Sequence, residues 1–212
     1  MKKVAIVCAA GKQGGMLVDE AISRGYDVTG VVRGNDKVAN AKAKTVVKDL
    51  FDLKKEDLAE FDVVIDAFGA WTPETLPLHK SSLNHLCDIL SGTLVRLLVV
   101  GGAGSLYVNP EHTLQVMQLD TFLDVFKPLA TNMGDALASL RTRSDVKWTY
   151  LSPAGNFVAD GERTGKYILG GEEYFVNAKG VSEISYADYA IAMIDEIENA
   201  DNIQKRFSVI GE

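Results

Sequence analysis

The segment Val4–Ile22, VAIVCAAGKQGGMLVDEAI, constrains the fold of this chain more than any other part of the sequence. Val4–Ala9 is short and apolar and is stopped by a glycine, which predicts a buried β-strand. Gly14–Arg24 carries apolar residues at helical spacing and is followed by Gly25, which predicts an amphipathic helix with a glycine stop. A chain that begins with such a strand–turn–helix unit is expected to build a sheet covered by helices.

The glycine turn between this strand and this helix favours an anion site. Backbone N–H groups at a helix N-terminus are unpaired and carry partial positive charge, so they bind a diphosphate. Glycine lets the backbone approach such a ligand closely because it has no side chain. The predicted binding residues are Ala10, Gly11, Lys12, Gln13 and Gly14. An ordinary strand–turn–helix without a ligand is the alternative interpretation.

Apolar strands and helices alternate through the first two thirds of the chain. The predicted strands after the first are Asp27–Val32, Thr45–Val47, Asp62–Ala67, Leu94–Val100 and Lys147–Leu151. The predicted helices between them are Asp52–Glu60, Leu78–Leu90 and a longer stretch from Glu111 that is broken by Pro128 and continues to about Arg143. Strands that are apolar on both faces and separated by helices are typical of a parallel sheet covered on both sides. The sequence therefore predicts an α/β, Rossmann-type, doubly wound parallel sheet with its ligand crevice at the carboxyl ends of the strands.

The sequence changes character after residue 152, where glycine becomes frequent. Lys166–Leu169 and Tyr174–Val176 flank a GGEE segment and predict a hairpin. A final helix is predicted from Ser185 and a final strand at Phe207–Ile210. With no linker visible, residues 1–212 are interpreted as one domain that contains a small C-terminal substrate-side lobe at residues 152–184.

Charge and cysteine content exclude several kinds of partner and site. The net charge of −7 and the pI near 5.0 argue against nucleic acid, whose phosphates require clustered Lys and Arg. Cys8 and Cys87 are too few for a disulfide framework, and no stretch reaches the roughly 20 apolar residues of a membrane span. We therefore expect a cytoplasmic protein with a small-molecule partner, either a monomer or a homodimer. The three histidines lack the spacing of metal ligands, so no metal is expected, and they are interpreted as surface or capping residues. Of the two tryptophans, Trp71 is interpreted as a loop anchor and Trp148 as a core residue.

The glycine segment resembles the GxxGxxG fingerprint of atypical short-chain dehydrogenases. In detail it is similar to that of NAD(P)H-binding flavin reductases related to biliverdin reductase B. Gly11 and Gly14 occupy the second and third glycine positions, whereas Cys8 stands at the first. Cys8 fits the turn if its φ is negative, but it leaves less room beside the cofactor. The stretch Ser152–Glu198 resembles the corresponding part of bacterial proteins assigned as NADH-flavin reductases, so the resemblance covers nearly the whole chain.

Arg33 indicates which dinucleotide is bound. It lies 19 residues beyond Gly14 and just past the second predicted strand, where NAD-specific folds place an acid on the ribose 2′-hydroxyl. An arginine at this position suits the 2′-phosphate of NADP, so NADPH is predicted to bind more tightly than NADH. The run VVRGNDK is similar to the NADP-preferring pattern of the same family. A solvated surface arginine is the alternative interpretation.

The resemblance implies further site residues. Asp49 and Leu50 are expected at the adenine, and Ala67, Phe68 and Gly69 along the cofactor. Gly102, Pro153 and Ala154 are expected beside the nicotinamide, and Asn156 and Phe157 at the edge of the substrate pocket. Ser105 is the candidate catalytic residue, placed to hydrogen-bond the reacting group. Helix capping by Asp49, strand-end packing by Phe68, a plain turn at Ser105 and core packing by Phe157 are the alternatives.

A missing pair of residues favours one reaction class. Classical short-chain dehydrogenases use a Tyr–x–x–x–Lys pair after the fifth strand, and residues 111–143 contain no tyrosine. Hydride transfer from nicotinamide C4 to flavin N5 needs no such acid, because the protein mainly positions two stacked rings. The sequence therefore predicts an NADPH-dependent reductase of FMN, FAD, riboflavin or a similar planar acceptor. An NADP(H)-binding redox sensor without turnover is the alternative, and a nucleotide-sugar epimerase is disfavoured because such enzymes usually retain the pair.

Overall fold

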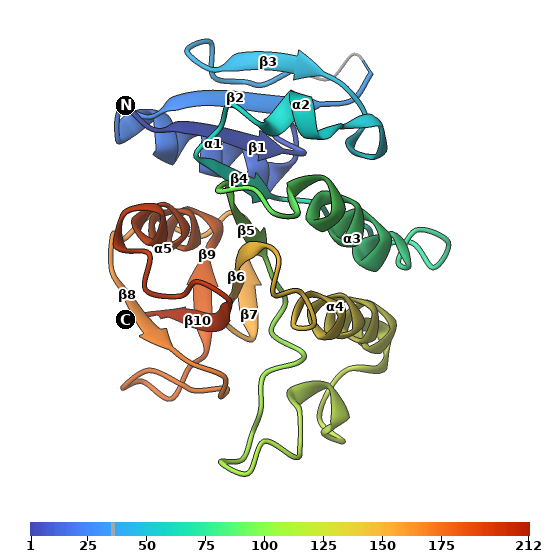
Figure 1. Cartoon of the computed structure of the whole chain (residues 1–212). Helices are drawn as coiled ribbons and strands as arrows, with labels where there is room; N and C mark the ends of the chain where they lie inside the picture. The colour runs from blue at the N-terminus through green and yellow to red at the C-terminus, as the bar shows by residue number, and fades with distance from the viewer. Residues whose placement is uncertain (35–36) are drawn as a thin grey trace.

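The computed structural model describes residues 1–34 and 37–212. Within these residues the main sheet has eight strands in the order β3-β2-β1-β4-β5-β6-β10-β8, and neighbouring strands are parallel except for β10 and β8 (Figure 1). Its strands are β1 (Lys3–Val7), β2 (Asp27–Val32), β3 (Lys44–Val47), β4 (Val63–Asp66), β5 (Arg96–Val100), β6 (Lys147–Ser152), β8 (Tyr167–Gly170) and β10 (Lys205–Gly211). A separate parallel pair is formed by β7 (Asn156–Val158) and β9 (Glu183–Ser185). The predicted α/β, Rossmann-type, doubly wound sheet is confirmed.

Helices cover both faces of the sheet. The helices are α1 (Lys12–Ser23), α2 (Lys55–Leu58), α3 (Leu78–Leu90), α4 (Lys127–Leu140) and α5 (Tyr186–Asn199), with 3-10 turns η1 (Leu50–Asp52), η2 (Val116–Gln118) and η3 (Asp124–Phe126). α1 packs beside α5 on one face, and α3 packs beside α4 on the other (Figure 1). In the described part of the chain, no helix is both long and apolar enough to cross a membrane.

The core is divided into two clusters by the sheet. Because successive side chains of a strand point to opposite faces, Val4 and Ile6 of β1 pack toward α1 and α5, whereas Ala5 and Val7 pack toward α3 and α4. All four side chains are fully buried. β1 therefore reads as continuously apolar because both of its faces are covered.

The strand order reverses between β1 and β4. From β1 the chain moves outward through β2 to β3, and it then returns to pair β4 with the other side of β1. The loops that leave β1 and β4 consequently turn to opposite faces of the sheet and leave a crevice between them at the carboxyl edge. The glycine turn of residues 8–11 lies at this switch point, as predicted.

The prediction of a long helix from Glu111 is wrong. Residues 111–126 form turns, including η2 and η3, and a regular helix begins only at Lys127. The Asn109 side chain accepts hydrogen bonds from the N–H groups of Thr113 (3.2 Å) and Leu114 (2.9 Å), which holds this segment in a turn instead of a helix. Pro128 lies in the first turn of α4, where its missing N–H costs nothing, so it helps to begin the helix and does not break it.

The predicted hairpin between Lys166–Leu169 and Tyr174–Val176 does not form. β8 pairs antiparallel with β10, with Ile168 opposite Ile210, and completes the edge of the main sheet. The second segment contains no strand, and its Tyr174 N–H donates to the Tyr107 carbonyl (2.7 Å) in the loop after β5. The buried β10 offers β8 a longer ladder than a short local partner, so the long-range pairing replaces the hairpin.

Other boundaries differ less from the prediction. The helix predicted at Asp52–Glu60 is reduced to the single turn of α2, preceded by η1. The predicted cap of the last helix is present, since the Ser185 hydroxyl accepts from the Asp188 N–H (3.0 Å). The predicted strand at Phe207–Ile210 is confirmed as β10.

Candidate functional site

The turn after β1 presents free backbone donors. The Gly11 N–H donates to the Cys8 carbonyl (3.0 Å), and the first intrahelical hydrogen bond of α1 runs from Gly15 to Gly11 (2.8 Å). The N–H groups of residues 12–14 precede that bond and have no acceptor within the helix. No side chain caps this N-terminus, where Gly11 is the N-cap residue. These three amide groups therefore form a ready anion site at the switch point.

α1 sits directly on the turn that precedes it. A Cβ atom on Gly14 would lie 2.4 Å from the Cys8 carbonyl oxygen and 2.9 Å from the Ala9 Cα. Both of these atoms belong to the backbone, which cannot move aside as a flexible side chain does. Gly14 is thus required for the close approach of helix and turn, and this approach aims the free amides at the crevice.

Cys8 adopts the conformation that glycine favours. Its φ is 61°, so the condition under which it was expected to fit the turn, a negative φ, is not met, and the residue holds the left-handed turn with a side chain present. This conformation costs roughly 1–2 kcal/mol for an L-residue. The thiol is half-buried against the core cluster under α3, and burial raises its pKa to about 12. Burial thus favours the protonated form of the thiol over the nucleophilic thiolate.

The residues predicted for the adenosine half follow β2 and β3. Arg33 is exposed directly after β2. Asp49 accepts a hydrogen bond from the Phe51 N–H (2.9 Å) and so caps η1, while Leu50 is buried. β2 and β3 run side by side, with Val32 opposite Val47, so Arg33 and Asp49 share one edge. Asn35 and Asp36 of the VVRGNDK run lie outside the described residues.

A buried carboxyl ends β4. Asp66 is only 4% exposed, its carboxylate accepts from the Phe68 N–H (3.0 Å), and it has no ion-pair partner within residues 1–34 and 37–212. Burial raises the pKa of this carboxyl to about 6. Beside it lies a cavity of about 20 Å³, room for one water molecule. Its lining includes His79, Met133 and Tyr150. The sequence ending VVID is the signal for this residue, because an acid closes an otherwise apolar strand.

The loop after β4 is held by a buried histidine. The expectation that His79 is a surface or capping residue is wrong, since it is only 7% exposed. Its Nε2 lies 3.3 Å from the Ala70 nitrogen and 3.1 Å from the Ala70 oxygen, and the ring packs edge-on against Phe68. Burial lowers the pKa of His79, which favours the neutral ring. The interpretation of Trp71 as a loop anchor is also wrong, because this side chain is 72% exposed.

The loop after β5 is covered by α4. The Gly102 N–H donates to the Tyr150 hydroxyl (3.1 Å), and the sulfur of Met133 lies 3.0 Å from the place that a Gly102 Cβ would occupy. The Gly102 backbone is therefore enclosed between Tyr150 of β6 and Met133 of α4. The side chain that α4 places over it is a thioether, which has no proton to donate.

Ser105 lies further along the same loop and is buried. Its hydroxyl oxygen accepts from a guanidinium nitrogen of Arg206 (3.2 Å) on β10, and Arg206 is in turn paired with Glu172. Arg141 also pairs with Glu172 (2.5 Å). Sequence reasoning did not identify Arg206 or Glu172, although a charged residue within the apolar strand RFSVI is a visible signal. A catalytic role for Ser105 stays a prediction.

The segment 152–184 and the start of α5 contact the start of α1. The Lys12 ammonium pairs with Asp160 of the segment (2.7 Å), and the Gln13 amide donates to the carbonyl of Tyr186, the first residue of α5 (3.3 Å). Phe157 packs against Tyr186, with ring centroids 4.1 Å apart. Pro153 and Ala154 are buried directly after β6, while Asn156 is exposed and donates to Glu183 (2.6 Å).

The sheet register brings most of the predicted residues to one edge. Val7 is opposite Asp66, Asp66 is opposite Val99, and Val100 is opposite Leu151. The loops that follow β1, β4, β5 and β6 therefore emerge side by side, and they carry the predicted residues 10–14, 67–69, 102 and 153–154. Arg33 and Asp49 continue the same edge through β2 and β3. This geometry suits a long ligand laid across the strand ends.

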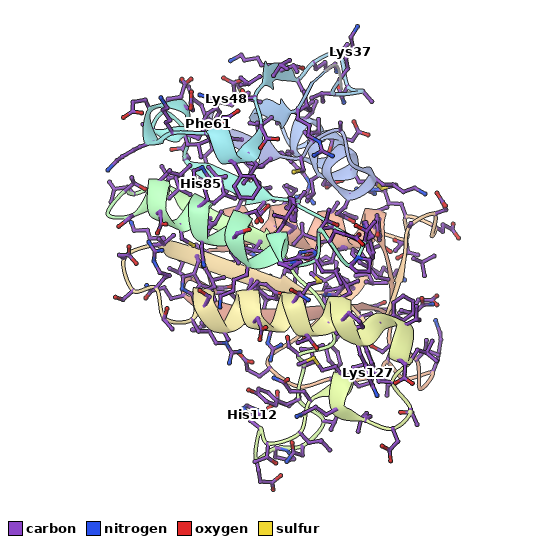
Figure 2. All side chains as sticks on the ribbon, turned by 90° about the vertical axis from the view of Figure 1, so that its right-hand side faces the viewer. Lys37, Lys48, Phe61, His85, His112 and Lys127 are labelled. Atoms are coloured by element: carbon purple, nitrogen blue, oxygen red, sulfur yellow. The ribbon has the colours of Figure 1, made fainter. Side chains whose placement is uncertain are left out.

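The described residues place no group of three or more His, Cys, Asp or Glu side chains where it could hold a metal ion. Figure 2 shows the separation of two histidines: His85 lies on α3, and His112 lies at the far end of the molecule in the segment before α4. His85 is half-buried and contacts the Leu53 carbonyl (3.0 Å), whereas His112 is exposed and contacts Glu173 (2.6 Å).

Known proteins resemble this chain over its whole length. Residues 8–197 match a family model described as NAD(P)H-binding. The chain is 43% identical over 211 residues to the uncharacterized protein YwnB of Bacillus subtilis (strain 168), with 99% of each protein covered. The structure of SP1627 from Streptococcus pneumoniae TIGR4, provisionally named an NADH-flavin reductase, is 47% identical, covers 100% of both chains and has a TM-score of 0.96. A structure from Bacteroides thetaiotaomicron, provisionally named an epimerase, is 34% identical over 99% of this chain and 97% of that one, with a TM-score of 0.85.

Two neighbouring glycines provide a matched test of the turn. Gly14→Ala forces a methyl group against the backbone of Cys8 and Ala9, so it is expected to lower the free energy of unfolding by about 2 kcal/mol and to abolish cofactor binding. At Gly15 the nearest atom to an added Cβ is 3.9 Å away, so Gly15→Ala is expected to keep binding and to gain up to about 1 kcal/mol from helix propensity. Urea unfolding and calorimetric titration with NADPH measure both effects. Equal free energies of unfolding and equal NADPH affinities of the two variants would contradict the packing argument.

The buried Asp66 is expected to make stability depend on pH. Its pKa is raised from 3.8 to about 6 in the folded protein, so the folded state holds this proton more tightly than the unfolded state does. The resulting stabilisation is complete below about pH 4 and is lost as the pH rises through about 6. Asp66→Asn does not titrate and so lacks this pH dependence. Between about pH 4 and about pH 8, its free energy of unfolding should therefore rise by about 3 kcal/mol relative to that of the natural protein. Urea unfolding of both proteins at the two pH values measures this change. The same difference in free energy of unfolding at both pH values would contradict the raised pKa of Asp66.

Proposed function

Because this chain belongs to the NAD(P)H-binding family, we propose that it is an NADPH-dependent oxidoreductase that reduces a flavin or a similar planar acceptor. The observation that carries the proposal is the row of free amide groups at residues 12–14, which faces the switch-point crevice of a doubly wound sheet. A dinucleotide's diphosphate is the ligand that such a helix N-terminus suits best.

Each half of the crevice has a proposed occupant. The adenosine half belongs to the edge formed by β2 and β3, with Arg33 at the 2′-phosphate and Asp49 and Leu50 at the adenine. The nicotinamide half belongs to the edge formed by β4, β5 and β6, beside Gly69, Gly102 and the buried pair Pro153 and Ala154. The lobe at residues 152–184 forms the acceptor side, and Ser105 is proposed to act there on the reacting group. A cytoplasmic monomer or homodimer is proposed.

The reaction class rests on what the chain places around the nicotinamide half. A bound nicotinamide supplies the hydride, so the protein's own residues have to hold two planar rings face to face and exclude water. α4 contributes Met133 above Gly102, and no tyrosine of this helix is available as an acid. Reduction of a flavin needs no such acid in the hydride step, whereas reduction of a ketone to an alcohol does. The surroundings therefore favour a flavin-like acceptor.

Turnover is the direct test of this proposal. Under anaerobic conditions the protein, mixed with NADPH and FMN or riboflavin, is expected to consume NADPH faster than the uncatalysed mixture does. Loss of NADPH absorbance measures the rate, and Gly14→Ala serves as the inactive control. Tight NADPH binding without turnover of any flavin or quinone would overturn the reductase and favour a redox sensor.

Arg33 should set the preference for NADPH. Arg33→Gln removes the cation proposed for the 2′-phosphate, so the dissociation constant of NADPH is expected to rise at least about tenfold while that of NADH stays unchanged. Lys147→Gln is the matched control, because it removes an exposed cation at the opposite edge of the sheet, where β6 begins. Calorimetry with both cofactors gives the dissociation constants of the natural protein and of the two variants. A similar loss of affinity for NADH would assign Arg33 to something other than the 2′-phosphate.

A further inference from the structure

Trp71 is an exposed indole at the candidate crevice. The side chain is 72% exposed, whereas the other tryptophan, Trp148, is 4% exposed and lies in the core as predicted. None of the aromatic pairs among the described residues includes Trp71, so both faces of its ring are free of aromatic neighbours. A large aromatic side chain left in water is a typical anchor for a ligand ring.

The loop that carries Trp71 is rigidly built. On its N-terminal side, Ala70 is buried and both of its backbone polar groups lie within hydrogen-bond distance of the His79 ring. On its C-terminal side, Thr72 and Thr75 close a turn, with the Thr75 N–H donating to the Thr72 carbonyl (2.9 Å) and the two hydroxyls 3.0 Å apart. The exposed indole is therefore displayed between two fixed points, which lowers the entropy cost of binding a ligand to it.

The indole lies over the predicted cofactor path. Its Nε1 is 3.6 Å from the position that a Cβ on Gly69 would occupy, so the ring folds back over Gly69 and does not extend away from the edge. Gly69 follows β4, and the Ala67 N–H donates to the Val7 carbonyl (3.2 Å) at the end of β1, directly before the glycine turn. Trp71 thus borders the same strand ends as the free amides of α1.

We propose that Trp71 stacks on the planar ring of the acceptor and selects flavin-like acceptors over non-aromatic ones. This inference rests on the proposed function and deepens it. The adenosine half is proposed to lie at β2 and β3. Trp71 follows β4, which lies on the other side of β1, toward β5 and β6. The nicotinamide is expected beside Gly69 and Gly102, on the strand ends themselves, so the ring left for the exposed indole to stack on is that of the acceptor. Stacking on an aromatic side chain requires no hydrogen-bond code, so it recognises any isoalloxazine.

The test uses binding without turnover. With the full-length protein saturated by NADP+, which cannot reduce a flavin, FMN is titrated and its own fluorescence is followed. A stacked indole quenches flavin emission, so the natural protein is expected to bind FMN and quench it. Trp71→Leu should raise the FMN dissociation constant about tenfold and restore emission at saturation, whereas Trp71→Phe should lie between the two. Leu94→Ala is the matched control, because Leu94 is 82% exposed at the opposite edge of the sheet, before β5.

The outcomes separate this inference from the proposed function. If the natural protein turns over flavin but Trp71→Leu keeps its KM and its quenching, the inference is overturned and the reductase stands. If FMN is bound and quenched through Trp71 but NADPH is never consumed, the reductase fails and the stacking role stands. If Trp71→Leu binds NADP+ more weakly than the natural protein does in the absence of FMN, the indole contacts the cofactor and the acceptor role is overturned. Absence of any FMN binding to the natural protein overturns the inference, and the turnover experiment then decides the reductase separately.

Discussion

The contact between α1 and the turn before it is the constraint on which the site depends. Helix and turn touch through bare backbone at Gly14, and any side chain there would push them apart. Because the helix begins at this contact, its first amide groups remain unpaired and converge on one point. The left-handed turn at Cys8 is part of the same geometry, and the chain maintains it with a residue that is strained there.

Two irregular loops beside the crevice, those after β4 and β5, are fastened by buried polar side chains. His79 holds the loop after β4 through Ala70, Tyr150 holds the loop after β5 through Gly102, and Arg206 holds Ser105 further along that loop. Loops have backbone groups that their own segment leaves unpaired, and a buried partner supplies the missing hydrogen bonds. The result is a crevice whose walls have fixed shapes although they contain no regular structure. Asp66 differs from these residues, since it is buried beside a cavity with a single backbone partner.

Local patterns in the sequence were sufficient to predict the sheet and the glycine turn. The runs VAIVCA and VVIDA are apolar because two helical layers cover them, so their burial is visible in the residues themselves. The hairpin at Lys166–Leu169 could not be excluded in the same way, because its real partner is β10, some forty residues away. The 111–126 segment was misread as helix, since its apolar residues recur at helical spacing while Asn109 holds its backbone in a turn. His79 and Trp71 were misplaced for a related reason: a single polar or aromatic residue carries no periodicity, and its burial is decided by distant neighbours.

β10 follows every other strand in chain order, yet it supports the side of the molecule proposed for the acceptor. It pairs with both β6 and β8, and its Arg206 joins Ser105 to Glu172. The edge proposed for the adenosine, by contrast, is assembled from β1, β2 and β3 within the first third of the chain. During synthesis on the ribosome, the strands proposed to receive the adenosine can therefore emerge while the side proposed for the acceptor still lacks its last strand. In a nascent chain, the edge proposed for the adenosine would therefore form before the strands proposed for the nicotinamide and the acceptor.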